Sequence, residues 1–300
     1  MIGKSIGMAR TVLVLAGCLG LMPAARAGPV LDRIRQTGKI VIGHREASVP
    51  FSYLDAEGRP VGYAIDLCLK IGEAVRRNLG LKSLAIEFVT VTSATRLAAV
   101  AQGQVDLECE STTNNAERRK TVAFAVPHYI TGARYLVRAD SPVRELKDFE
   151  GRTLVSTVGT TPLKAVQQAN GERLLGIRIA TVPDHVRGVE MVEKGEADGF
   201  VMDEVLLVGL VSGRPDPARL KIVGKYLTIE ALGIMLPRTD PEFKQIADAE
   251  MKRLILSNEA KAIHDRWFTR PIPPAGRSLN LPMNHLHRDF WKYPSDWVPG

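Results

Sequence analysis

The chain has 300 residues, which is enough for two modest domains with a core each. Hydrophobic residues make up 45% of it and charged residues 24%, the composition of an ordinary globular protein. The formal net charge is +7, and Lys4, Arg10 and Arg26 account for three of these charges, since no acidic residue precedes Gly28. The remaining 7 − 3 = +4 is spread along the chain, which argues against a nucleic-acid-binding surface.

The N-terminus has the features of a secretory signal. Two basic residues precede the apolar run 11–21, and Ala25-Arg26-Ala27 supplies the small residues that a signal peptidase reads. The apolar run is too short for a transmembrane helix. We therefore predict that residues 1–27 are a signal peptide and that the mature protein begins at Gly28, free in the periplasm.

A second interpretation of this segment stays open. Leu15-Ala16-Gly17-Cys18 matches a bacterial lipoprotein box, which would leave Cys18 as a lipidated first residue. Both routes take the protein out of the cytoplasm of a bacterial cell. In that oxidising compartment Cys68 and Cys109 could form a disulfide or remain two buried thiols, and the sequence leaves both alternatives open.

The first half of the chain alternates predicted strands and helices. The apolar run 39–43 reads as a buried strand, a hairpin turn follows at 55–58, and Asp66 is expected to cap a helix. A strand at 84–89 and a short helix to Gln102 come next. This alternation indicates a parallel, doubly wound sheet.

The segment 107–119 is expected to hold an anion. A short strand ends there, three hydroxyl residues follow, and Asn114-Asn115 opens a predicted helix that carries Arg118. Free N–H groups at a helix N-terminus, with a guanidinium one turn on, suit a carboxylate or a phosphate. Taken alone, such a sequence more often marks a capped helix with solvated arginines.

The same alternation restarts in the second half of the chain. Extended runs at 130–137 and 224–236 read as two crossings between lobes. Further strands are predicted at 152–157, 177–182 and 197–202, each followed by a helix. The turn and strand that lead to Glu110-Ser111 resemble those that lead to Asp203-Glu204, which indicates two similar α/β lobes.

Polar side chains follow six of the predicted strands. They are Arg45, Ser93 with Arg96, Ser111 with Thr113 and Arg118, Thr161, His185, and Asp203. Because ligands bind beyond the carboxyl ends of the strands in doubly wound sheets, we expect these groups to converge, although each one alone is more often structural. Three arginines, a histidine and several hydroxyls face one carboxylate. This set suits an amino acid with an acidic side chain.

The chain resembles a known family in several motifs. L-E-C-E-S-T-T-N-N-A-E-R-R at 107–119, with G-H-R-E-A-S-V-P-F-S-Y, T-S-A-T-R, G-T-T and V-M-D-E elsewhere, resembles the glutamate/aspartate-binding periplasmic proteins of ABC importers. The resemblance covers about 31–274, and S-T-T-N-N-x-E-R is its most specific part. It implies a type II periplasmic binding protein, in which two α/β lobes close on the ligand by a hinge and the second lobe is inserted in the first.

The resemblance also implies domain boundaries and partners. The first lobe would comprise residues 28–133 and 227–271, the second residues 134–226, and a surface tail residues 272–300. The implied ligand is L-glutamate or L-aspartate, and the implied partner is the membrane permease of an ABC importer. We expect a monomer without a cofactor.

By position, the resemblance assigns a role to each candidate residue. Arg118 would hold the α-carboxylate with Ser111, Thr113 and Thr161, and Asp203 would pair with the α-ammonium. The remaining residues match positions around the ligand's side-chain carboxylate: Arg45, Ser93, Arg96 and His185.

One residue departs from the family pattern. Glu110 stands where the family usually has Gly. A carboxylate that points inward at this position should weaken the binding of acidic ligands. Another polar amino acid is therefore an alternative ligand.

An enzyme and a receptor sensor domain are two alternative classes of function. The same fold hosts periplasmic enzymes resembling cyclohexadienyl dehydratase, for which Glu110 is the only candidate acid or base. The sequence holds no nucleophile elbow, metal-spaced His/Cys set or phosphate loop, and His285-x-His287 is expected at the surface. A receptor sensor domain would need a transmembrane helix after the lobes, and the sequence shows none there. We therefore expect neither catalysis nor a metal site.

Overall fold

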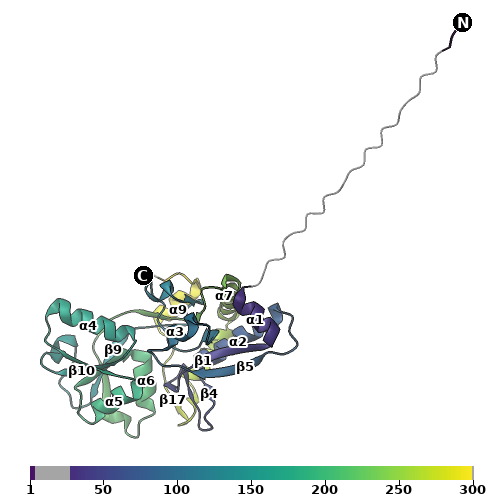
Figure 1. Cartoon of the computed structure of the whole chain (residues 1–300). Helices are drawn as coiled ribbons and strands as arrows, with labels where there is room; N and C mark the ends of the chain where they lie inside the picture. The colour runs from purple at the N-terminus through teal and green to yellow at the C-terminus, as the bar shows by residue number, and fades with distance from the viewer. Residues whose placement is uncertain (4–27, 299–300) are drawn as a thin grey trace.

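The computed structural model describes residues 1–3 and 28–298. The apolar run and cleavage site of the predicted signal peptide, and the lipoprotein box that ends at Cys18, lie outside the described residues. Two α/β lobes lie side by side, each built on its own five-stranded sheet (Figure 1). The predicted two-lobe architecture is confirmed.

The first lobe is built on a sheet with the strand order β5-β1-β6-β15-β7. Its strands are β1 (Lys39–His44), β5 (Ala85–Thr90), β6 (Leu107–Glu108), β7 (Ala123–Phe124) and β15 (Met235–Leu236). Its helices are α1 (Pro29–Thr37), α2 (Tyr63–Asn78), α3 (Arg96–Ala101), α7 (Pro241–Leu256) and α8 (Glu259–Phe268). Leu67, Ile71 and Val75 of α2 are fully buried, because their spacing places them on one face of the helix.

The second lobe repeats this plan with the strand order β11-β10-β12-β9-β13. Its strands are β9 (Ala133–Arg138), β10 (Thr153–Thr157), β11 (Arg178–Val182), β12 (Gly199–Asp203) and β13 (Leu220–Val223). Helices α4 (Thr161–Arg173), α5 (His185–Glu193) and α6 (Glu204–Ser212) pack on this sheet, with short 3-10 turns at Leu146–Phe149 and Pro217–Arg219. β6 and β12 hold equivalent places in the two sheets, as the internal sequence similarity predicts.

Two crossings join the lobes through a small antiparallel pair. β8 (Tyr129–Thr131) pairs with β14 (Glu230–Leu232), and Ile130 lies opposite Ala231. Each crossing strand continues into the next sheet, where β9 and β15 run antiparallel to their neighbours. The sheets are therefore mixed and not purely parallel as predicted. Since the chain leaves the first sheet after β7 and returns to it at β15, the second lobe is inserted in the first.

Helix α2 begins earlier than the sequence predicts. It starts at Tyr63, and the backbone carbonyls of Pro50 and Phe51 accept hydrogen bonds from the N–H groups of Tyr63 and Ala64 at 2.8 and 2.9 Å. The hairpin β2 (Ala47–Ser48), β3 (Ser52–Leu54) and β4 (Pro60–Val61) positions these carbonyls. Asp66 is not a cap, and its carboxylate instead accepts from Trp267 Nε1 at 2.7 Å.

The segment after β6 is extended, and the predicted helix there is wrong. Thr113 forms a bridge with Leu232, and the N–H of Asn114 donates to the carbonyl of Ala231 at 2.8 Å. Only a short 3-10 turn follows, at Arg118–Lys120. Pairing with the second crossing supplies the backbone hydrogen bonds that a helix would otherwise have supplied.

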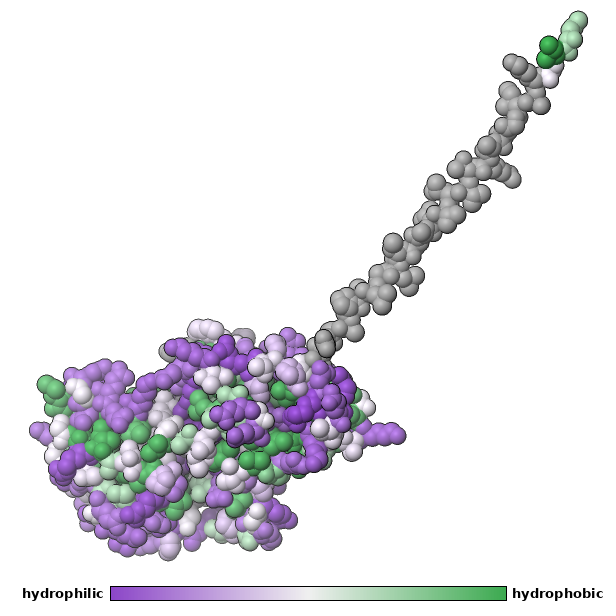
Figure 2. All heavy atoms as spheres, viewed as in Figure 1, coloured by the Kyte–Doolittle hydropathy of each residue, from purple (hydrophilic) through white to green (hydrophobic). Residues whose placement is uncertain are grey.

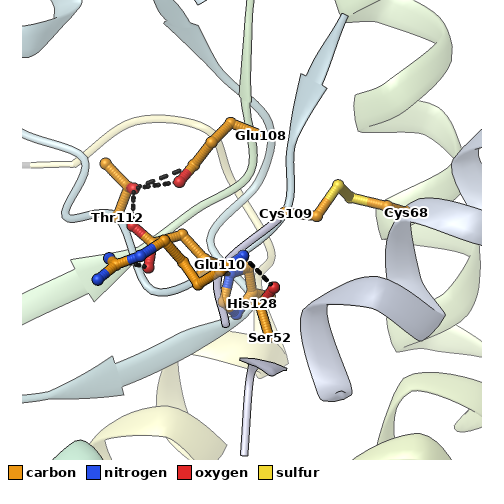
Figure 3. The surroundings of a disulfide bond; sticks show 8 residues. Ser52, Cys68, Glu108, Cys109, Glu110, Thr112 and His128 are labelled. Carbon is orange, nitrogen blue, oxygen red and sulfur yellow. Dashed lines mark hydrogen bonds and ion pairs between the residues drawn. A yellow bond between two sulfur atoms is a disulfide. The ribbon is translucent and has the colours of Figure 1, made fainter. Parts of the chain in front are cut away.

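A disulfide links Cys68 of α2 to Cys109 at the end of β6, and both residues are fully buried (Figure 3). Their Cα atoms are 6.2 Å apart. The structure thus contains the disulfide and not two free thiols. The bond fixes the end of β6, which directly precedes Glu110, to a core helix.

The tail packs mainly on the first lobe and on β8, and Arg277 also donates to the carbonyls of Ser212 and Arg214 in the second lobe. β16 (Pro271–Ile272) pairs with β17 (Arg277–Ser278), and α9 (His285–Lys292) follows. His287 is fully buried against Tyr129 and Trp291, so its predicted surface position is wrong, whereas His285 is exposed. His287 and Trp291 are four residues apart and therefore share the inner face of α9.

The surface mixes polar and apolar residues. Figure 2 shows hydrophilic residues over much of the visible face, with hydrophobic ones scattered among them, which is normal for a surface in contact with water. In the part of the chain that the structure describes, no helix has both the length and the apolar character needed to cross a membrane.

Candidate functional site

A small pocket lies between the lobes. Seven of the nine predicted site residues line it: Ser93, Arg96, Ser111, Thr113, Thr161, His185 and Asp203. Arg45 and Arg118 stand directly behind this lining, since Arg45 donates to the Ser93 hydroxyl and Arg118 to the Thr113 carbonyl. The structure therefore brings the predicted groups together from both lobes.

The two lobes touch across the cavity. The Thr161 hydroxyl donates to the Thr113 hydroxyl at 2.9 Å, and Arg118 Nη2 donates to the carbonyl of Gly159 at 3.1 Å. Gly159 has a φ of +78°, and a Cβ there would lie 2.5 Å from the carbonyl oxygen of Ser93. Because several donors and acceptors meet across the gap, the lobes stand in a closed arrangement.

Asp203 provides a buried acceptor without a partner. It ends β12 and precedes α6, but its side chain makes no capping hydrogen bond to that helix. The Oδ1 atom is buried and has no hydrogen-bond partner among the described residues. Burial raises the pKa of this carboxyl well above its usual range, and the nearby Glu230 carboxylate adds to the shift. A cationic group in the cavity would supply the missing partner.

Arg118 lies where the lobes meet. Its Nη1 donates to the carbonyl of Thr113 at 3.0 Å, and its Nη2 donates to Gly159 of the second lobe. The side chain is nearly buried at 8% exposure. A guanidinium has five N–H donors, so Arg118 can hold these carbonyls and still donate to an anion.

Arg45 and Arg96 form a second cationic group, and both are bound to Glu110. Arg45 Nη1 donates to Ser93 Oγ at 2.8 Å and to Glu110 Oε2 at 3.0 Å, while Arg96 Nη1 pairs with Glu110 Oε1. The Nε of Arg96 is buried and has no partner in the described part of the chain. Glu110 is fully buried. Its carboxylate thus points inward. This is the orientation in which we expect Glu110 to weaken the binding of acidic ligands.

Glu108 connects to this group through Thr112 (Figure 3). The Thr112 hydroxyl lies 3.0 Å from both Glu108 Oε2 and Glu110 Oε1. One hydroxyl proton cannot serve two carboxylates, so a second proton must be present if both contacts are hydrogen bonds. Burial raises the pKa of Glu108 to about 7, whereas Glu110 is ion-paired with Arg45 and Arg96, so Glu108 is the carboxyl better suited to hold this proton.

His185 lines the second lobe's side of the cavity. Its Nδ1 lies 2.8 Å from the Thr157 hydroxyl, which leaves Nε2 as the nitrogen that can contact a ligand. Burial, together with the positive charges of Arg45 and Arg96, holds the pKa of His185 well below its usual range. The ring is therefore neutral at pH 7 and contributes a hydrogen bond without a charge.

Sequence reasoning missed Glu108, Thr112 and Glu230. Glu230 lies on the second crossing, and it accepts hydrogen bonds from the hydroxyls of Thr113 and, at 2.7 Å, of Thr228. Glu108 carried a usable signal, because side chains two positions apart in a strand face the same side, which places it with Glu110. Glu230 carried none, since its contact with Thr113 spans 117 residues.

The described residues contain no group of three or more His, Cys, Asp or Glu side chains that could hold a metal ion. The chemistry of the cavity is that of recognition by charge. Two separate cationic groups and one unpaired carboxylate can bind a small molecule that carries an ammonium group and at least one carboxylate.

Comparisons with known proteins agree with this chemistry. The family of bacterial extracellular solute-binding proteins, family 3, matches residues 40–270. The chain is 39% identical to the L-glutamate/L-aspartate-binding protein of Pseudomonas aeruginosa, across 89% of this chain and 88% of that one. It is 36% identical to the glutamate/aspartate import solute-binding protein of Escherichia coli K12, across 96% of this chain and 97% of that one.

Solved structures show the same fold. A mutant of ArgBP from T. maritima superposes with a TM-score of 0.70 at 25% identity, and covers 80% of this chain and 99% of its own. An ancestral amino acid-binding protein, AncCDT-1, described as a precursor of cyclohexadienyl dehydratase, gives a TM-score of 0.68 at 24% identity, over 79% of this chain and 98% of its own. The latter likeness concerns the fold alone.

The curated relatives that are similar over most of the chain are solute-binding proteins and not enzymes. The alternative of a dehydratase therefore has no support from them. With the family match over 40–270 and the two-lobe fold, the chain belongs to the bacterial extracellular solute-binding proteins of family 3.

Proposed function

We propose that this protein captures an acidic amino acid, L-glutamate or L-aspartate, in the cavity between its lobes and delivers it to the membrane permease of an ABC importer. The observation that carries this proposal is the unpaired, buried Oδ1 of Asp203, which shares one cavity with Arg96 and has Arg118 directly behind the lining. The relatives named as glutamate/aspartate-binding proteins support the choice of ligand.

The ligand's three charged groups have a place each. Asp203 binds the α-ammonium, and Arg118 binds the α-carboxylate with the hydroxyls of Ser111, Thr113 and Thr161. The side-chain carboxylate lies toward the opposite group, made up of Arg45, Ser93, Arg96 and His185. Since acceptors and donors come from both lobes, a ligand bound between them stabilises the closed arrangement.

The remaining parts of the proposal concern location and organisation. The protein works in the periplasm as a monomer after removal of residues 1–27. The first lobe comprises 28–133 and 227–271, the second comprises 134–226, and the crossings β8 and β14 serve as the hinge. The contacts of Thr161 and Arg118 across the cavity support closure as the event that a permease recognises.

Calorimetric titration tests this proposal. The chain from Gly28 onward is titrated with glutamate, aspartate, glutamine and arginine, and small-angle scattering is recorded with and without the ligand that binds. We expect saturable binding of the acidic amino acids and a smaller radius of gyration in their presence. Binding of arginine with no heat from glutamate or aspartate would refute the proposed ligand class.

A further inference from the structure

Glu110 occupies the arginines that the proposed function assigns to the ligand's side-chain carboxylate. Its Oε2 lies 3.0 Å from Arg45 Nη1, and its Oε1 pairs with Arg96 Nη1. All three side chains are almost fully buried. Resting on the proposed function, we infer that Glu110 is a specificity-determining residue, a tethered carboxylate that competes with the ligand's side-chain carboxylate for these two arginines.

The charges on this side of the cavity support the inference. Without Glu110 the two guanidinium groups would present two uncompensated positive charges, the setting that best favours a second carboxylate on the ligand. With the Glu110 carboxylate in place, the three side chains together carry a net charge of +1. A ligand carboxylate that approaches the same donors also meets the Glu110 carboxylate, and like charges at close range in a buried site repel each other.

Glu110 is also held firmly in this position. The hydroxyls of Ser48, Ser111 and Thr112 lie 3.5, 3.4 and 3.0 Å from its carboxylate oxygens. The preceding residue, Cys109, is fixed to α2 by the disulfide. Because a ligand cannot push this side chain aside without breaking these contacts, competition and not simple displacement is expected.

An acidic ligand still finds a donor. The buried Nε of Arg96 has no partner within the described residues, and His185 lines the same cavity. A glutamate side chain can therefore bind, but on fewer free donors than the two arginines could offer. A neutral amide such as that of glutamine suffers no repulsion from Glu110. Glu110 should thus narrow the difference in affinity between glutamate and glutamine.

A purely structural role for Glu110 predicts something else. If Glu110 only holds Arg45 and Arg96 in position, its removal should disorder the site and weaken every amino acid by a similar factor. Competition predicts that removing the charge strengthens glutamate binding and leaves glutamine binding little changed. The ratio of the two affinities therefore separates these roles.

The test uses two substitutions in the chain from Gly28 onward. Glu110→Gln keeps the size of the side chain and removes its charge, and Glu110→Ala removes both. Glu57→Gln, on an exposed turn away from the cavity, is the matched control. Dissociation constants for glutamate and glutamine are measured by calorimetry for each protein. Since Glu110→Ala leaves two buried arginines without their partner, thermal unfolding with and without glutamate is recorded as a second measurement.

We expect Glu110→Gln to raise the glutamate-to-glutamine affinity ratio by about tenfold or more, while Glu57→Gln leaves it unchanged. In Glu110→Ala, glutamate should raise Tm by more than it does in the unsubstituted protein, because its carboxylate replaces the missing one. Equal weakening of both ligands, or an unchanged ratio, would overturn the inference while leaving the proposed function intact. Absence of binding of every amino acid to the unsubstituted protein would overturn the proposed function, and the inference with it.

Discussion

Replacing Asp203 with Asn should have two effects of opposite sign, higher stability without ligand and loss of tight binding. Asp203 is only 3% exposed, and its Oδ1 has no partner among the described residues. Burial raises the pKa of this carboxyl, so keeping it ionised at pH 7 costs folding free energy. Asn has nearly the same shape and no charge, and it therefore removes that cost.

The size of each effect follows from this environment. A buried group without a partner costs more when it is charged than when it is neutral. Asn leaves a neutral polar group at this site, so the free energy of unfolding of Asp203→Asn should rise by the difference, on the order of 1 kcal/mol or more. For a chain of this size, each kcal/mol raises Tm by about 2–4 °C. Loss of the partner of a buried ammonium should weaken ligand binding by roughly 2–5 kcal/mol, or roughly 30- to 5,000-fold in Kd.

Differential scanning calorimetry without ligand and titration calorimetry with glutamate measure the two effects. The matched control is Asp140→Asn, because the Asp140 side chain is 79% exposed and pairs only weakly with Arg138 at the surface. It should change neither quantity. A lower Tm for ligand-free Asp203→Asn would show that Asp203 has a partner within the protein. Unchanged glutamate affinity would show that it does not bind the ammonium group.

Three further predictions concern other parts of the structure. Arg118→Ala should weaken the binding of glutamate and of glutamine alike, by roughly 2–5 kcal/mol. Arg45→Ala should weaken the binding of glutamate more than that of glutamine. Calorimetry that shows equal losses for both ligands in Arg45→Ala would contradict the role of Arg45 in holding the side-chain carboxylate. Because the folded-state pKa of Glu108 is raised from 4.5 to about 7, the free energy of unfolding should fall as pH rises between these values, by roughly 3 kcal/mol. Glu108→Gln should remove this part of the pH dependence of the free energy of unfolding, measured by urea denaturation. An unaltered pH profile would contradict the assignment of this dependence to Glu108. Replacing Cys68 and Cys109 with Ser should lower the free energy of unfolding by about 4 kcal/mol, the value expected for a 41-residue loop, and equal urea midpoints would refute a stabilising disulfide.

Local sequence signals predicted the framework of the fold well. Thr160 caps α4 by accepting from the N–H of Leu163 at 3.3 Å, and Pro162 lies in the first turn, as the sequence Gly-Thr-Thr-Pro indicates. Asp240 caps α7 (Pro241–Leu256) by accepting from the N–H of Phe243 at 3.0 Å, and Pro241 is the first residue of that helix. In each case, the signal and the structure it determines lie within a few residues of each other.

The errors arise where distant segments decide the local structure. Asn114-Asn115 was expected to open a helix, but Thr113 and Asn114 pair with the second crossing, which is more than a hundred residues away. His287 was expected at the surface, but it is buried against Tyr129 of the first crossing. These two residues are far apart in the sequence, so no local signal shows this contact. Propensity and capping signals contain no information about such partners, and tertiary contacts override them.

The candidate site shows the same contrast between features set by local sequence and features set by distant contacts. The strand ends predicted which residues converge, because the carboxyl ends of parallel strands meet at one edge of a sheet. The ion pairs and hydrogen bonds inside the site were not predictable, since Glu110 pairs with Arg45 across 65 residues and Glu230 accepts from the Thr113 hydroxyl across 117. The net charge offered to a ligand depends on these pairs. The sequence could therefore place the site more securely than it could rank the ligands.

A crystal structure of the chain from Gly28 onward, grown with L-glutamate, would test the central claim most directly. The account predicts one glutamate in the cavity between the lobes, with its ammonium group within hydrogen-bond distance of Asp203 Oδ1 and its α-carboxylate on Arg118. Glutamate bound outside this cavity, or bound within it with the ammonium group away from Asp203, would contradict the account.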